Sequence, residues 1–292
     1  MDIEAINGAG MVALGCTLVY LLVAKSWGAI FRVLGNGASF PDTIMHEAAQ
    51  RLRDELQRLS ASQSIYLGGL LVFAMLFLAA NTLEARRLFA GYPDWQLHLQ
   101  FLFLLLATTF ILCELGVTIV RKRRLRFRAL ANIAVGHRLQ QISSASTQVF
   151  HDVETTAGVI DHVVISRTGL YAVNVVCRRA SGAATVSVEN DALVFSDAAP
   201  KRPINDLVAM IRALEQDFEA LLGYKVRIRS VVAVPGWEAT SQAAAGHLLV
   251  NEKNVTMLTG WKTHADQLMH DDVDRLQQAM TSRCLRATAG TR

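Results

Sequence analysis

Charge is scarce in this chain: only 18% of its 292 residues are Asp, Glu, Lys or Arg, whereas a soluble domain carries about 25%. Proline is also scarce, with five residues, while 52% of the residues are hydrophobic. This balance excludes an intrinsically disordered chain, and the composition excludes collagen-like and low-complexity classes. The deficit of charge instead indicates membrane segments.

Paired cysteines are missing as well. The four cysteines, at positions 16, 113, 177 and 284, show no paired spacing. The sequence therefore predicts neither a disulfide framework nor a zinc knuckle, and buried or free reduced thiols are expected.

Three long runs nearly free of charge lie in the first 120 residues. Twenty uncharged residues separate Glu4 from Lys25, and 25 separate Arg58 from Glu84. The 26 residues from Trp95 to Val120 contain one acid, Glu114, and one histidine, His98. About 20 helical residues cross the hydrocarbon of a bilayer. We therefore predict membrane helices at 5–24, 59–83 and 95–120. The acidic start of the chain argues against a signal peptide, which begins with basic residues.

The basic residues predict the orientation of these helices. Residues 1–128 hold 13 basic and 9 acidic residues, whereas residues 129–292 hold 16 of each. Eleven of the basic residues follow the first or the third run, and only Arg86 and Arg87 follow the second. Because basic loops stay in the cytoplasm, we predict a multi-pass protein of the inner membrane, with its N-terminus outside and residues 129–292 in the cytoplasm. The pI near 9.0 then reflects topology more than nucleic-acid binding.

Three further features belong to this membrane domain, residues 1–128. Apolar residues at helical spacing predict a cytosolic amphipathic helix at about 42–59, which follows Pro41 and is capped by Asp42. The basic cluster 121–128 is expected to anchor the third helix and to attract anionic lipids. Glu114 lies about 10 Å of helix before Arg121, so it is expected to reach the interface.

The remaining residues, 129–292, alternate strands and helices. A helix is expected at 130–142 and strands at 148–152, 158–165 and 169–176, the last two joined as a hairpin by Ser166–Gly169. A second hairpin is expected at 184–188 and 192–195. A helix after Pro203, strands at 228–234, 247–250 and 255–258, and a last helix at 261–284 complete an α/β domain with a mixed sheet and flanking helices.

Two of these strands resemble the NERD (nuclease-related domain) family. The residues are Gly158-Val-Ile-Asp-His-Val-Val-Ile-Ser166 and, after a glycine turn, Gly169-Leu-Tyr-Ala-Val173. The helix 203–222 and the segment Val231–Gly236 also look like the family, and the likeness covers roughly residues 130–257. It implies a restriction-endonuclease-like core that binds Mg²⁺ through an acid on one strand and an acid-x-Lys pair on the next. Such carboxylates hold a hard cation that polarises the phosphodiester and its attacking water.

The chain departs from this family pattern at most of its catalytic positions. Asp161 supplies the first acid and the one clear metal ligand. The acid-x-Lys pair is replaced by Asn174-Val175-Val176, and the Gly-Glu of the preceding helix by Gly136-His137. The resemblance therefore implies a vestigial or residual nuclease site at Asp161 and Asn174, where Mg²⁺ binds weakly or not at all.

Other residues are candidates to replace the missing groups. Glu154 precedes Asp161 by seven residues, Arg178 and Arg179 follow the second strand, and Glu189 begins a turn. The histidines have no metal-ligand spacing, so hydrogen-bonded or surface roles are expected for them. They are His151, His162, His247, His264 and His270.

Three functions remain open from the sequence. The first is a membrane-anchored binding or scaffold module with a degenerate nuclease-related domain, serving DNA-handling or membrane-associated machinery. The second is an active Mg²⁺-dependent nuclease at the inner membrane, acting in defence or in mobile-element DNA processing. The third is a transporter component that uses Glu114. The expected partners are membrane lipids, DNA, and a protein partner or a second copy of the chain.

Overall fold

The computed structural model describes residues 3–34, 45–82, 93–144, 146–179, 184–197, 200–239, 243–244, 246–260 and 267–284. The chain divides into two compact units. The helical unit comprises Met1–Ser39 and Asp54–Leu125, and the α/β unit comprises Phe40–Arg53 and Arg126–Arg292.

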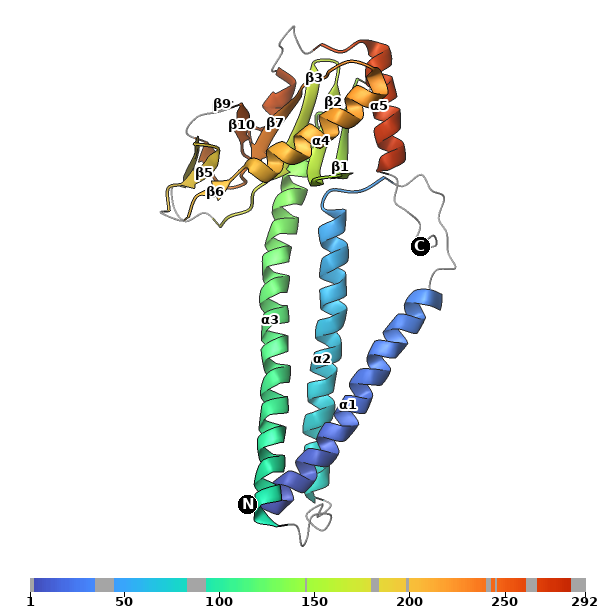
Figure 1. The fold of residues 1–292 in the computed structure, drawn as a ribbon, viewed down its shortest axis with the longest axis vertical. Helices are drawn as coiled ribbons and strands as arrows, with labels where there is room; N and C mark the ends of the chain where they lie inside the picture. The colour runs from blue at the N-terminus through green and yellow to red at the C-terminus, as the bar shows by residue number, and fades with distance from the viewer. Residues whose placement is uncertain are drawn as a thin grey trace. The chain divides into compact units, whose positions relative to one another are not determined.

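Three long helices are present: α1 (Ile3–Leu34), α2 (Gln50–Thr82) and α3 (Asp94–Gln140) (Figure 1). We expected separate helices at 42–59 and 59–83, but α2 is a single helix that begins at Gln50; positions 42–44 lie outside the described residues. Likewise, α3 unites the expected helices 95–120 and 130–142. The basic cluster between them continues the helix because Arg, Lys and Leu are strong helix formers.

Two helices, not the three we predicted, are long and apolar enough to cross a membrane among the described residues. They are Gln50–Ala79 and Phe101–Gln140. The expected first span corresponds to the apolar stretch Ala9–Ala24 of α1, which is shorter than the 18 residues required. By length and composition, the structure therefore supports two candidate spans and a shorter apolar helix.

The helical unit has small residues inside and large apolar residues outside. Ala9, Ala13 and Thr17 of α1, which share one face, are between 0% and 2% exposed. At Gly69 of α2, an added Cβ atom would contact Leu21, so the missing side chain allows close helix packing. Leu or Phe side chains are instead exposed along all three helices, including Leu18, Leu22, Leu67, Leu71, Leu78, Leu99, Phe103, Leu106 and Phe110.

The α/β unit is built on a six-stranded mixed sheet of order β1-β2-β3-β7-β10-β9. Its strands are β1 (Thr147–Thr155), β2 (Gly158–Ser166), β3 (Gly169–Val175), β7 (Ile228–Ala233), β10 (His247–Val250) and β9 (Ala243–Ala244). β1, β2 and β3 are antiparallel neighbours, whereas β3, β7 and β10 run parallel. The predicted α/β class with a mixed sheet and the predicted hairpin at 158–176 are confirmed.

Helices cover both faces of this sheet. On one face, α4 (Asn205–Leu222) and α5 (His270–Arg283) pack against β1, β2 and β3 (Figure 1), in a core that includes Leu214, Leu276 and Ile160. On the other face, Val135 and Leu139 of α3 pack against the same strands. Alternating apolar residues along each strand supply both cores.

A second sheet follows β3, with the order β6-β5-β4-β8. Its strands are β4 (Thr185–Glu189), β5 (Ala192–Phe195), β6 (Arg202–Pro203) and β8 (Glu238–Ala239). The expected second hairpin is confirmed as β4 and β5. Asn190 and Asp191, with φ of 48° and 55°, form its turn, a conformation that Asn and Asp tolerate best after glycine.

Two expectations near the C-terminus were wrong. Residues 255–258 are not a strand but part of a 3-10 helix, Val255–Gly260. The side-chain oxygen of Asn251 accepts the N–H groups of Lys253 and Asn254, both at 3.0 Å, so the chain turns before a strand can form. The last helix begins at His270 rather than at Trp261; residues 261–266 lie outside the described part.

Residues 45–53, which we call the docking segment, lie against β1. β1 is an edge strand, yet residues 150–153 are at most 8% exposed. The His46 N–H donates to the Cys284 carbonyl at the end of α5, at 3.0 Å. The Arg51 N–H donates to Asp152 Oδ2 on β1, also at 3.0 Å. The docking segment therefore helps to cover an edge that would otherwise present unpaired backbone groups.

Candidate functional site

Asp161 lies where β2 and β3 separate. Their ladder runs from Ser166 opposite Gly169 to His162 opposite Val173, and Asp161 and Asn174 are the next residue of each strand beyond its end. Asp161 Oδ2 accepts the Val175 N–H at 2.7 Å. The carboxylate thus takes the place of a carbonyl that would otherwise satisfy this backbone group.

Helix α3 supplies the second residue of the site. The amide side chain of Asn132 hydrogen-bonds to the Asp161 carboxylate. From the sequence we had placed the matching position at Gly136-His137. In the structure His137 is exposed, and Asn132, one turn earlier, is the residue that contacts Asp161. Sequence analysis missed Asn132 because its neighbour in space is 29 positions away.

Two polar atoms beside Asp161 have no hydrogen-bond partner among the described residues. They are Oδ1 of Asn132 and Nδ2 of Asn174, in side chains that belong to residues only 2% and 3% exposed. An unsatisfied buried polar atom costs about 1–3 kcal/mol. Such atoms therefore mark a place where water or a ligand completes the structure.

The charge state of Asp161 reflects opposing influences. Burial of its carboxyl group raises the pKa, and the neighbouring charge of Asp152 raises it further. The hydrogen bonds from Val175 and Asn132 and the charge of Arg128 lower the pKa. Burial is the largest of these effects, so the pKa of Asp161 lies above the ordinary value for aspartate.

The second acid near Asp161 is Asp152, not the Glu154 that we had proposed. Glu154 is exposed and lies opposite Val159. Asp152 is 5% exposed. It lies on β1 between the residues that pair with His162 and Ile160, and its charge raises the pKa of Asp161. A φ of 51° at Asp152 turns its backbone out of the regular strand conformation, which strand alternation alone does not reveal.

The other proposed substitutes have different contacts. Arg178 forms an ion pair with Asp197 at 2.7 Å and lies over the Phe195 ring, 4.8 Å from its centroid. Glu189 forms an ion pair with Lys201 at 3.2 Å, and Arg179 is exposed. Arg178 and Glu189 therefore form their ion pairs with residues around the second sheet. Neither arginine supplies the positive charge that a lysine on β3 would provide.

A histidine pair lies next to the two aspartates. Nδ1 of His151 and Nδ1 of His162 are 2.8 Å apart, from neighbouring strands. Burial lowers the pKa of His151 to about 4, and burial together with the charge of His151 holds the pKa of His162 well below 6.5. One neutral ring therefore donates to the other, which agrees with the hydrogen-bonded role expected from the sequence.

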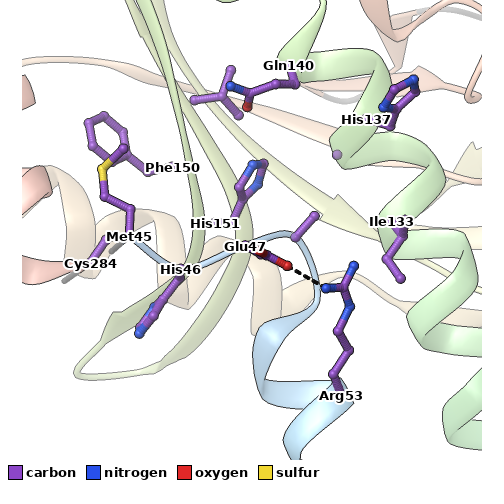
Figure 2. Close-up of a pocket in the computed structure, with 13 residues that line it drawn as sticks. Met45, His46, Glu47, Arg53, Ile133, His137, Gln140, Phe150, His151 and Cys284 are labelled. Carbon is purple, nitrogen blue, oxygen red and sulfur yellow. Dashed lines mark hydrogen bonds and ion pairs between the residues drawn. The ribbon is translucent and has the colours of Figure 1, made fainter. Parts of the chain in front are cut away.

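Gly136 allows α3 to approach this pair. A Cβ atom at Gly136 would lie 2.5 Å from the Ala48 Cβ and 3.1 Å from a His162 ring carbon. Next to it is a cavity of about 360 Å³ between α3, β1 and the docking segment. Figure 2 shows the His151 ring pointing into this cavity, with Glu47 paired to Arg53 at its side.

The donors around Asp161 suit a divalent cation but not the complete hydrolytic chemistry. A carboxylate and an open carboxamide oxygen are ligands that Mg²⁺ accepts, with water completing its octahedral shell. Among the described residues, no group of three His, Cys, Asp or Glu side chains converges on one point. Val176 stands where the resemblance implies a lysine. Asp161 and Asn132 would hold the cation, and it would supply charge to bind a phosphate oxygen.

Residues 129–235 match the model of the nuclease-related domain family. This segment is therefore similar to the NERD family, and we call it the NERD domain. The matched range contains α3 from Ala129, the strands β1, β2 and β3, helix α4 and strand β7, so Asp161 and Asn132 both belong to the NERD domain. No match was found among curated proteins or among solved structures.

Proposed function

We propose that the protein is anchored in a membrane and presents its NERD domain as a binding or scaffold module for DNA-handling or membrane-associated machinery. The single observation that carries the binding role is that the Asp161 carboxylate already accepts hydrogen bonds from the protein. It is hydrogen-bonded by Val175 and Asn132, and Asn174 stands where the resemblance implies the acid of the acid-x-Lys pair. This arrangement favours a stable fold and ligand contact over rapid hydrolysis, because metal-dependent hydrolysis needs the missing acid-and-lysine pair.

The membrane anchor is supported by the inverted packing of the helical unit. Large apolar side chains exposed along three helices are unfavourable in water and favourable in lipid. Two helices also have the length and composition of membrane spans. Carbonate extraction of membranes tests this part: the intact chain should stay in the pellet, and its release into the supernatant would refute the anchor.

We further propose an inner-membrane location with the NERD domain in the cytoplasm. Six of the eight residues from Arg121 to Arg128 are basic, and such clusters stay on the cytoplasmic side. The N-terminus lies outside if α1 crosses as a third, shorter span. Alkaline phosphatase and fluorescent-protein fusions at each end of the chain test both placements.

An active Mg²⁺-dependent nuclease is the second candidate function. The open Asn132 oxygen beside Asp161 favours it, since it is a ready cation ligand. Plasmid nicking with Mg²⁺ or Mn²⁺ separates the two functions, using the full chain in detergent and Asp161→Ala as the control. The scaffold proposal expects no cleavage above that of the variant, and cleavage that is lost in the variant would replace it with the nuclease.

A constructive test restores the residues of the NERD pattern that this chain lacks. Asn174→Glu combined with Val176→Lys restores the acid and the lysine on β3. If the missing groups alone limit hydrolysis, this double variant should cleave DNA when the natural chain does not. A transporter role has no support of this kind, because Glu114 is exposed on α3 rather than enclosed within the helical unit.

A further inference from the structure

A second cleft, of about 540 Å³, lies between α4 and the strands β7 and β10. Its walls are one face of α4, the starts of β7 and β10, and Asp191 in the turn between β4 and β5. Sites for small molecules have volumes of about 300–1,000 Å³. None of the lining residues is among those that hydrogen-bond to Asp161 or shift its pKa. The cleft is therefore separate from the Asp161 site.

Two buried polar residues line this cleft. Ser230 of β7 and His247 of β10 are opposite each other in the parallel ladder, and the two residues are 7% and 6% exposed. Nδ1 of His247 lies 2.7 Å from Ser230 Oγ. The other ring nitrogen, Nε2, has no hydrogen-bond partner among the described residues. A bound molecule can therefore use this nitrogen.

The charge state of His247 determines what the ring offers. Burial lowers the pKa of His247, and this effect is larger than the opposing effect of the Asp191 charge. The ring is therefore neutral at pH 7. When Ser230 donates its hydroxyl proton to Nδ1, the neutral ring carries its own proton on Nε2. Nε2 then donates a hydrogen bond to an oxygen atom of a ligand.

Arginine side chains supply positive charge at the cleft. Arg212 of α4 and Arg227, which precedes β7, are exposed, and neither forms a hydrogen bond or ion pair with another described residue. A third arginine of the lining, Arg229, lies over the Tyr171 ring, 5.9 Å from its centroid. Two guanidinium groups thus remain for a ligand, and arginine binds phosphate oxygens through two parallel N–H groups.

Two acids also line the cleft, but only one has a free carboxylate. Oε1 of Glu215 accepts the Ile228 N–H at 2.8 Å, so this carboxylate holds β7 against α4. Asp191 is exposed, and its side chain forms no hydrogen bond with another described residue. A carboxylate in this position repels a second anion and accepts a hydroxyl proton of a ligand.

The start of α4 adds a further attraction for an anion. Asn205, the first residue of this helix, lines the cleft, and no side chain among the described residues caps the helix. The N–H groups of an uncapped helix start attract negative charge. The Ile204 N–H donates to the Asp191 carbonyl at 2.9 Å, so the β4–β5 turn is fixed beside this helix start.

We propose that this cleft binds a small phosphate monoester of the class and size of a nucleoside monophosphate. Arg212, Arg227 and the first turn of α4 bind the phosphate group, and Nε2 of His247 donates to one of its oxygens. Asp191 accepts a hydrogen bond from a sugar hydroxyl. The inference goes beyond the proposed scaffold function, because the site does not use Asp161 and selects a free phosphate monoester.

Calorimetric titration with AMP tests the arginines, using the full-length protein in phosphatidylcholine nanodiscs at physiological salt. Arg212→Gln and Arg227→Gln should each weaken AMP binding about tenfold or more, because each removes a charge-assisted bond to phosphate. Arg275→Gln removes the same charge from an exposed position on α5 outside the cleft and should leave the affinity unchanged. Natural protein that binds no AMP, or equal losses in all three variants, would overturn the proposal.

A steric variant tests the cleft without any change of charge. Ala209 and Ala220 are both exposed on α4, and only Ala209 lines the cleft. Ala209→Phe should fill the cleft and abolish AMP binding, whereas Ala220→Phe should bind AMP like the natural protein. Undiminished binding by Ala209→Phe would place the ligand elsewhere. Thermal unfolding checks that both variants are folded.

Competing ligands identify the source of the phosphate. Inorganic phosphate should displace AMP, whereas a short DNA duplex should not. Displacement by the duplex would overturn the small ligand in favour of nucleic acid. Loss of AMP binding when phosphatidylglycerol replaces part of the lipid would assign the cleft to a lipid headgroup instead. Asp161→Ala should bind AMP with the natural affinity, and a loss there would place the ligand at the Asp161 site.

Discussion

The helical unit and the α/β unit use apolar residues in opposite ways. In the helical unit, Ala9 and Ala13 are fully buried while Leu22 and Leu106 are 67% and 59% exposed. In the α/β unit, Ile160 and Leu214 are fully buried, and charged side chains such as Lys201 and Glu189 are largely exposed. The helical unit thus has the distribution of residues that is typical of proteins in lipid, and the α/β unit has the distribution that is typical of proteins in water.

The largest expected effect is a polar substitution on the exposed apolar surface of the helical unit. Leu106→Asp should cost about 3 kcal/mol if this surface faces lipid, whereas Leu221→Asp, at a position 44% exposed in the α/β unit, should change stability by less than about 0.5 kcal/mol. The measurement is the carbonate-resistant membrane fraction of each variant, together with its thermal unfolding in nanodiscs. Equal behaviour of the two variants would remove the contrast between the units.

The next largest effect compares alanine substitutions at two glycines of α3, which should change the stability in opposite directions. Gly136→Ala should cost about 2 kcal/mol, because its Cβ would overlap Ala48 and press on His162. A Cβ at Gly116 meets nothing within 4 Å, so Gly116→Ala should stabilise the helix by about 0.5–1 kcal/mol. Hydrogen exchange of β1 amides should report the first change and stay constant for the second. A neutral Gly136→Ala would show that the docking segment does not pack as closely as described.

Acidification should destabilise the α/β unit. Burial lowers the pKa of His151 from 6.5 to about 4, so below pH 6.5 the unfolded chain binds protons that the folded chain excludes. Each such histidine removes about 1.4 kcal/mol per pH unit between these limits. The buried Asp152 and Asp161 act in the opposite direction, because their raised pKa values make the folded state bind protons above pH 3.8.

Denaturant unfolding between pH 7 and pH 5 measures this slope. His151→Gln should flatten it. A slope that is the same in this variant and in the natural protein would rule out the buried pair as its source.

The smallest expected effects lie in the second sheet and compare two ion pairs. Arg178→Ala should cost about 1–2 kcal/mol, because Arg178 also packs on Phe195 and Trp237. Lys201→Ala should cost less than about 0.5 kcal/mol, since both side chains of its pair are more than half exposed. Urea unfolding of the two variants provides the values, and a larger loss for Lys201→Ala would reverse the expected order.

The sequence predicted local features well. Uncharged runs gave the long helices, and alternating apolar residues gave β2, β3 and the β4–β5 hairpin. The breaks between helices that we expected near residue 59 and at 121–130 were wrong. A change in polarity along the chain does not end a helix when the residues at the change favour helical structure. The expected strand at 255–258 failed because a single asparagine side chain redirects the backbone.

The candidate site was predictable only in part. Asp161 and Asn174 follow from the motif on two adjacent strands. Asn132 and Asp152 do not, because their roles depend on tertiary contacts. Asn132 lies on α3 and reaches Asp161 on β2. Asp152 lies on β1 and binds the N–H of Arg51 at the start of α2. Contacts between residues far apart in the chain leave no local pattern in a single sequence.

The facing ring nitrogens of His151 and His162 carry a consequence for spectroscopy. Because two neutral imidazoles share one proton between their Nδ1 atoms, the two rings must be opposite tautomers, one Nδ1–H and one Nε2–H. Nitrogen-15 labelling of histidine would therefore yield two distinct pairs of resonances from within the NERD domain. The pair lies next to Gly136 and Asp152. These signals would therefore report whether the docking segment is in contact with β1.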